Sequence, residues 1–148
     1  MTAFQPRNPD FRAFLERYVS AQLYLKLLGV ALGRVEPGLV EFHVPFRADL
    51  GQQDGVVHGG VMGSLAEGAM GCAAATMVAA GANVVGAEYK VNLLAAGRGA
   101  AIIARGQVIK PGRRLIVCRA DIFAVAEDGA ETLCAIAQGT MAVVDPPA

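Results

Sequence analysis

The pattern of apolar positions predicts a helix near the start of the chain. Apolar and aromatic residues recur three and four positions apart through Asp10–Leu28, as they do on one face of a helix. Asp10 is suited to cap the helix start, and Gly29 is suited to end it. The positions that share the predicted buried face are Phe11, Phe14, Leu15, Tyr18, Val19 and Gln22.

A longer apolar run predicts a second helix, from about Gly60 to Ala79. Apolar residues cover all its sides, which is typical of a helix at the centre of a fold. A membrane span would need about 20 uninterrupted apolar residues. His58 and Glu67 break the run, and Ala and Gly outnumber Leu and Ile, so we expect a buried helix and no membrane contact.

Six segments rich in Val, Ile and Leu predict strands. Two precede the central helix, Val30–Val35 and Leu39–Pro45, with the turn-forming EPG between them. The second segment alternates, so His43 is expected on the strand face opposite Phe42 and Val44, in a structural role. The other four segments, separated by short Gly-containing turns, span residues 83–95, 100–110, 114–126 and 131–144.

The order of these elements predicts an α+β fold. The four final strands follow one another by short connections, which favour an antiparallel sheet. A curved sheet wrapped around the long apolar helix would bury all sides of that helix. We therefore expect a single domain over residues 1–148, with an N-terminal helix at about 10–28 and a core at about 30–144.

Composition narrows the class of protein. Apolar residues make up 54% of the chain, charged residues 18%, and the formal net charge is zero, which argues against a nucleic-acid-binding protein. With no export signal near the N-terminus, the scattered Cys72, Cys118 and Cys134 are expected to be reduced core residues of a cytoplasmic protein. The cysteines and histidines lack metal-ligand spacing, and no metal or other cofactor is expected. The high apolar content predicts contact with another subunit.

The chain resembles the hotdog-fold acyl-CoA thioesterases from about Val30 to Val144. The segments that carry the resemblance are HGGVMGSLAE (58–67), GAEYKVNLLAAG (86–97) and VIKPGRRLIVCRADIF (108–123). They are most similar to the phenylacetate-pathway type. The resemblance implies an antiparallel sheet around a central helix, hydrolysis of a medium-sized or aromatic acyl-CoA, and active sites at a dimer interface.

Three positions depart from that pattern. Glu67 stands where many members of the branch carry Asp, although Glu occurs in one type of 4-hydroxybenzoyl-CoA thioesterase, which also carries Gln at the position of Gln52. Gly71 replaces a frequent hydroxyl residue, and Ala95–Ala96 replaces a common proline. These departures leave the expected reaction class unchanged, but they leave the identity of the acyl group undetermined.

The start of the central helix offers a means of polarising a thioester carbonyl. Unpaired backbone N–H groups gather at a helix start, and Gly59 and Gly60 would let a carbonyl approach them closely. The resemblance points to Gly59 as the donor to the oxyanion, with His58 shaping the loop or contacting the carbonyl. It also assigns a catalytic role to Gln52, in the polar segment Arg47–Gly55 that we expect to be a loop.

Glu67 would supply the base or the nucleophile, and the sequence does not choose between these roles. It follows His58 by nine positions, about 13 Å along a helix, which is too far to act at the same carbonyl within one chain. Two chains with antiparallel central helices would bring Glu67 of one to the helix start of the other. We therefore predict self-association as a dimer, or as a tetramer built from dimers.

Basic residues are candidates for binding the phosphate groups of coenzyme A. Lys110, Arg113 and Arg114 surround a predicted turn, and Arg98 is expected to join them. Gly60 and Gly86 are also assigned to substrate binding. The walls of the acyl pocket are expected from the central helix, at Met62, Leu65 and Met70.

Two other functions stay open. A hotdog-fold dehydratase or hydratase also pairs a histidine with a carboxylate, but neither an HFPG-like nor a DxNxxH-like loop occurs in the chain. A non-catalytic acyl-CoA-binding module would be favoured by an attached DNA-binding region, for which the N-terminal helix is too short and not basic enough.

Overall fold

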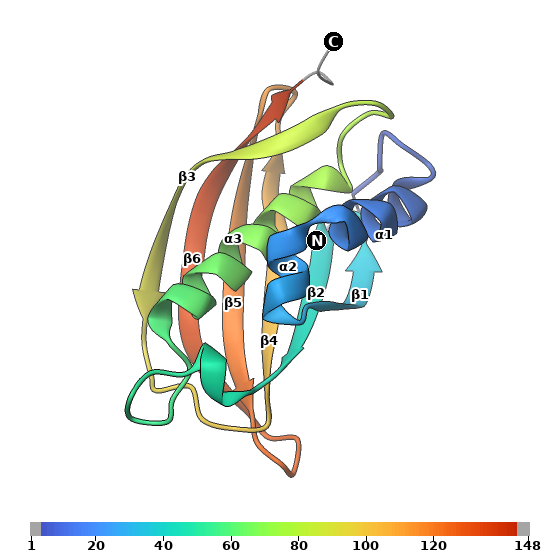
Figure 1. Ribbon diagram of the computed structural model, residues 1–148. Coiled ribbons are helices and arrows are strands. Elements are labelled where there is room, and N and C mark those ends of the chain that lie inside the picture. Colours follow the sequence, from blue (N-terminus) through green and yellow to red (C-terminus); the bar gives the residue numbers. More distant parts are fainter. Residues whose placement is uncertain (1–3, 145–148) are drawn as a thin grey trace.

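The computed structural model describes residues 4–144 and contains one antiparallel sheet curved around a long helix (Figure 1). The predicted frayed tail at 145–148 lies outside the described residues. The helices are α1 (Phe11–Ala21), α2 (Leu23–Leu28), α3 (Gly59–Ala75) and the 3-10 helix η1 (Ala48–Leu50). The strands are β1 (Ala31–Glu36), β2 (Leu39–Pro45), β3 (Asn83–Leu93), β4 (Ala101–Pro111), β5 (Leu115–Val125) and β6 (Glu131–Val144).

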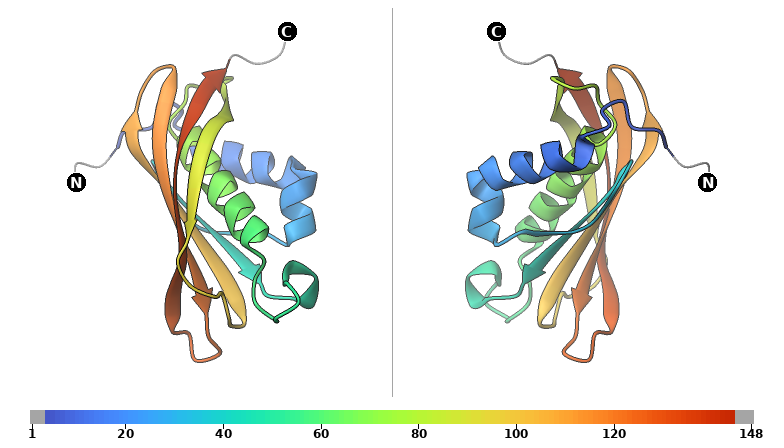
Figure 2. Two further views of the ribbon diagram at one scale, coloured as in Figure 1. Left: turned by 90° about the vertical axis from the view of Figure 1, so that its left-hand side faces the viewer. Right: turned by 90° about the vertical axis from the view of Figure 1, so that its right-hand side faces the viewer.

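All the helices lie on one side of the sheet (Figure 2), which confirms the predicted α+β class. The strand order is β1-β2-β4-β5-β6-β3, and every neighbouring pair is antiparallel, as predicted. β3 pairs with β6 and not with β4, which follows it in the chain. The connection over residues 94–100 therefore carries the chain from the edge of the sheet to its middle. No helix within residues 4–144 is long and apolar enough to cross a membrane.

α3 is buried because its small residues let the sheet approach closely. A side chain at Gly106 of β4 would overlap the backbone of Ala69. The helix ends at Ala75 and not at the predicted Ala79, because Thr76 caps it. The buried Thr76 hydroxyl donates to the Ala73 carbonyl and accepts from the Gly38 N–H, both at 2.7 Å, and so ties the helix end to the β1–β2 turn.

The predicted N-terminal helix is two helices. Gln22 has an extended backbone, with φ −80° and ψ 107°, and separates α1 from α2. The Asp10 side chain makes no capping hydrogen bond; instead, the Asn8 side chain accepts from the Asp10 N–H at 3.0 Å. Gly29 ends α2 with a left-handed backbone, φ 77°, as predicted.

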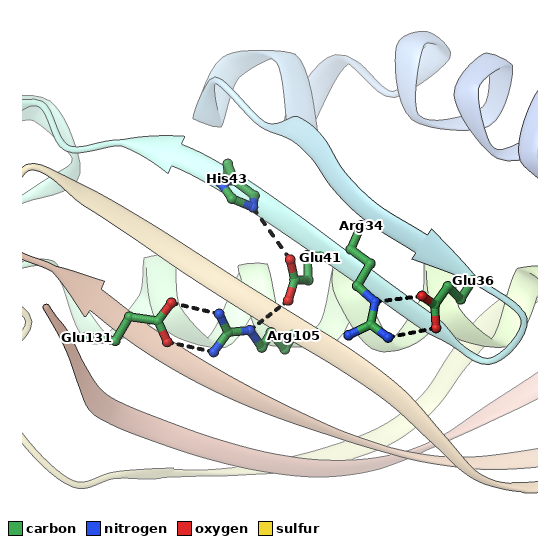
Figure 3. A network of polar contacts seen from close by, with 6 residues as sticks. All are labelled: Arg34, Glu36, Glu41, His43, Arg105 and Glu131. Atoms are coloured by element: carbon green, nitrogen blue, oxygen red, sulfur yellow. Dashed lines mark hydrogen bonds and ion pairs between the residues drawn. The ribbon is translucent and has the colours of Figure 1, made fainter. Parts of the chain in front are cut away.

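His43 lies on the face of the sheet turned away from α3, opposite the buried Phe42 and Val44, as predicted. It belongs to an ionic network across the strands (Figure 3). Its Nε2 is 3.7 Å from Glu41 Oε2, and Arg105 pairs with Glu41 at 2.7 Å and with Glu131 at 2.6 Å. The network ties β2 and β4 to the start of β6, away from α3.

Candidate active site

The N-terminus of α3 presents one unused backbone donor. His58 caps the helix, and its Nδ1 accepts a hydrogen bond from the Gly60 N–H at 2.9 Å. The N–H groups of Val61 and Met62 donate to the His58 carbonyl. Within residues 4–144 the Gly59 N–H donates to no acceptor. The Gly59 N–H is therefore available to an acceptor such as a carbonyl oxygen, while the Gly60 N–H is already engaged with His58.

The segment before α3 is more ordered than the predicted loop. The η1 turn is followed by a β-bridge between Gly51 and Val57. The His58 N–H donates to the Leu50 carbonyl at 2.9 Å, and the Val57 N–H donates to the Gly97 carbonyl at 3.0 Å. These bonds hold the helix start in place, whereas the Gln52 side chain is exposed on the same segment.

Glu67 lies half-buried in the middle of α3. Among the described residues its carboxylate makes no hydrogen bond and no ion pair. Burial removes water from the charged form and raises the pKa of Glu67 above its ordinary value of 4.5. A carboxylate without a partner at a partly dry position is characteristic of functional sites.

Glu67 faces a cavity of about 540 Å³ between the N-terminal helices, α3 and β3. The residues that line it are Gln22, Tyr24, Leu25, Ser64, Glu67, Gly68, Gly86, Ala87, Glu88 and Tyr89. The predicted wall residues Met62, Leu65 and Met70 are not among them, because they are buried on other sides of α3. The face of the helix that lines this cavity carries Ser64, Glu67 and Gly68.

Two hydroxyl groups connect the cavity wall to the helix start. The Ser64 hydroxyl donates to the Gly60 carbonyl at 2.9 Å and lies 2.9 Å from the Tyr24 hydroxyl. Because the single Ser64 proton is used on Gly60, Tyr24 is the donor in the second bond. Sequence reasoning missed Tyr24 and Ser64, and it placed Gln22 only on the buried helix face.

The structure does not bring the predicted catalytic residues together within one chain. Gln52, His58 and Gly59 are absent from the lining of the cavity that contains Glu67. Helix α3 is continuous from Gly59 to Ala75, so Glu67 stays about 12 Å along its axis from Gly59. A reaction that uses both Gly59 and Glu67 at one carbonyl needs a second chain.

The predicted basic group is divided between two ends of the sheet. Lys110, Arg113 and Arg114 are exposed around the β4–β5 turn, and none of their side chains is paired with another described residue. Arg98 precedes β4 and donates to the Asp54 carbonyl at 3.4 Å. An 11-residue strand separates the two positions, a span of about 35 Å, so Arg98 does not join the turn within one chain.

The cysteines are buried, as predicted. Burial raises the pKa of Cys72 and Cys118 to about 12, so both thiols stay protonated at neutral pH. In the described part of the chain, no group of three His, Cys, Asp or Glu side chains is placed to hold a metal ion.

Known proteins resemble this chain in sequence and in structure. A family model described as the thioesterase superfamily matches residues 54–131. A thioesterase-family protein from Silicibacter pomeroyi aligns with a TM-score of 0.88 at 30% identity, over 91% of this chain and 98% of that one. A thioesterase from Haemophilus influenzae aligns with a TM-score of 0.77 at 28% identity, over 88% of each chain.

A more distant structure shares the fold. The PaaI protein from the E. coli phenylacetic acid degradation operon aligns with a TM-score of 0.81 at 18% identity, over 95% of this chain and 97% of that one. Comparison with curated proteins finds no match.

Proposed function

Because this chain belongs to the thioesterase superfamily and has the hotdog fold, we propose that it hydrolyses acyl-CoA thioesters to a free acid and coenzyme A. The observation that carries the proposal is Glu67, a half-buried carboxylate that faces a cavity and has no partner within residues 4–144. The carboxylates of Glu41 and Glu131 differ from Glu67, because both are paired with Arg105.

The reaction uses two groups from two chains. The thioester carbonyl oxygen accepts from the Gly59 N–H of one chain, where the helix dipole also stabilises the negative charge that develops. Glu67 of the other chain takes a proton from water as the water oxygen bonds to the carbonyl carbon, which gives a tetrahedral oxyanion. The oxyanion then collapses and breaks the carbon–sulfur bond, and the coenzyme A sulfur leaves with the proton that Glu67 held. In the alternative course, the Glu67 carboxylate attacks the carbon itself and expels the coenzyme A thiolate. The resulting anhydride is then hydrolysed by water to the free acid and the Glu67 carboxylate.

The free edge of β3 supports the pairing of two chains. β3 is the last strand of the sheet, and its outer edge has no partner in residues 4–144 (Figure 1). Its side chains include Tyr89 and Leu93, which are 45% and 58% exposed. A long apolar edge strand is an aggregation hazard unless it is covered. Two β3 strands paired antiparallel about a twofold axis would cover both edges and lay the two α3 helices side by side in opposite directions.

The exposed cations fit the phosphate groups of the substrate. Lys110, Arg113 and Arg114 lie near the C-terminal end of α3, and Arg98 lies near its N-terminal end. In an antiparallel dimer, the β4–β5 turn of one chain, with its three cations, lies toward Arg98 of the other chain. Coenzyme A therefore binds with contributions from both chains, and the acyl group enters the Glu67 cavity, whose volume suits a medium-sized or aromatic group.

Release of free thiol tests the activity. The protein is incubated with benzoyl-, phenylacetyl- and fatty acyl-CoA in the presence of a thiol dye, beside the Glu67→Gln variant. We expect turnover of at least one ester, and a loss of about a hundredfold or more in kcat for the variant, the usual scale of general-base catalysis. Binding without thiol release would favour the non-catalytic acyl-CoA-binding module instead. Full activity of Glu67→Gln would remove Glu67 from the mechanism.

A further inference from the structure

Strand β3 contains a bulge beside Glu67. The register against β6 shifts between Gly86 and Glu88, so Ala87 is an extra residue with no opposite partner. Before the bulge the buried side chain is Val84, and after it Tyr89 and Val91 lie against Gly63 of α3. The bulge thus changes which alternate residues face the helix. Bulges with this effect are frequent next to active sites, where they redirect side chains.

Gly86 leaves the space that the Glu67 carboxylate occupies. A methyl group on Gly86 would have its carbon 2.5 Å from Glu67 Oε1 and 3.6 Å from Glu67 Cδ. The backbone of Gly86 is outside the left-handed region, so an alanine is compatible with its conformation. A glycine is needed here for space and not for backbone shape.

We propose that Gly86 and the bulge at Ala87 position the Glu67 carboxylate for the proposed hydrolysis, on which this inference rests. Since the carboxylate has no hydrogen-bond partner among residues 4–144, contact with the β3 backbone is what limits its orientations. The contact also keeps water from one side of the carboxylate. Gly86 is therefore a positioning residue for Glu67.

The Gly86→Ala variant tests the contact, because the flexible Glu67 side chain is the group that must move. We expect kcat to fall at least about tenfold with little change in KM, since small displacements of a catalytic group are costly. Displacement into water should also lower the Glu67 pKa, measured from the side-chain carboxyl carbon by NMR titration. That readout does not depend on activity.

Gly63→Ala is the matched control. It adds a methyl group between the same helix and strand, at an ordinary contact distance of 3.6 Å from the Tyr89 hydroxyl. We expect its kcat and its Glu67 titration to equal those of the unmodified protein.

Adding Glu67→Asp to Gly86→Ala withdraws the carboxylate from the new methyl group. The double variant should therefore lose less than the product of the two single losses. If Gly86→Ala alone fails to fold, recovery of folding in the double variant supports the contact, and failure of both overturns it.

Two outcomes distinguish the positioning role of Gly86 from the catalytic role of Glu67. Wild-type kcat and an unchanged Glu67 titration in Gly86→Ala, beside an inactive Glu67→Gln variant, would overturn the positioning role alone. A shifted titration in Gly86→Ala beside a fully active Glu67→Gln variant would keep the contact and overturn the catalytic role of Glu67.

Discussion

The charge of Glu67 is unfavourable in the folded chain. Its side chain is half-buried, no described residue neutralises it, and burial raises its pKa above 4.5. The folded state therefore binds a proton more tightly than the unfolded state does. The contribution of Glu67 to stability is therefore fully present below its ordinary pKa of 4.5 and is lost as the pH rises through its raised folded-state pKa.

This linkage predicts a stabilising effect of Glu67→Gln that depends on pH. At pH 7 we expect the variant to gain up to about 1 kcal/mol in the free energy of unfolding, a modest amount because solvent still reaches the carboxylate. Below pH 4.5, where Glu67 is protonated in both states, the gain should disappear. Urea denaturation at pH 7 and pH 4 measures it. Equal effects at the two pH values would show that the charge is not the cause.

Sequence patterns pointed to the candidate reactive residues but not to their surroundings. His58, Gly59 and Glu67 were predicted because their types and spacing form a motif. The engagement of the Gly60 N–H by His58 depends on a ring orientation that no pattern encodes. Periodicity cannot identify the face of α3 that lines the Glu67 cavity, because this helix is apolar on all sides.

At the scale of elements, the break between α1 and α2 is set by tertiary contacts. The local residues Ala21, Gln22 and Leu23 include no Gly or Pro that would interrupt a helix. α1 is anchored in the core by Leu15 and Val19, and α2 is anchored by Leu25 and Leu28. The two anchors bend the chain at Gln22 and turn Gln22 and Tyr24 into the cavity.

We predict that the Tyr24–Ser64 hydrogen bond influences the choice of acyl group. Tyr24→Phe removes the bond that holds α2 to α3, at a cost of about 1 kcal/mol or less because Tyr24 is 54% exposed. The ratio of kcat/KM between aromatic and straight-chain esters should change several-fold, about the scale of 1 kcal/mol.

Ser64→Ala breaks the same bond from the other side. If the bond matters, the two variants should change the ratio in the same direction. Unchanged ratios in both would contradict a role for α2 in selecting the substrate.

The order of elements was largely predictable, and the pairing of strands was not. Alternation and turn residues indicated all six strands, and short connections indicated an antiparallel sheet. The placement of β3 beside β6 depends on the crossover at 94–100, whose length alone does not decide which edge a strand joins.

At the scale of the whole molecule, the proposed reaction needs two chains, because Gly59 and Glu67 lie about 12 Å apart along α3. Mixing two inactive variants tests this directly. Gly59→Val blocks the carbonyl site, and Glu67→Gln removes the base. In a mixed dimer one site keeps Gly59 from one chain and Glu67 from the other, so subunits exchanged at equal amounts should recover about a quarter of full activity.

The control is each variant exchanged with itself, which should stay inactive. If the mixture recovers nothing although mixed dimers are shown to form, the two groups do not share a site across chains.

The uncovered edge of β3 also has a consequence for the order of folding and assembly. Each chain can form its own core, because α3 and the sheet bury each other within one copy. In the proposed shared site, catalytic competence requires the association of two folded copies. After dilution from denaturant, native spectroscopic signals should return at a rate independent of concentration, while enzymatic turnover lags behind and catches up sooner in more concentrated solution.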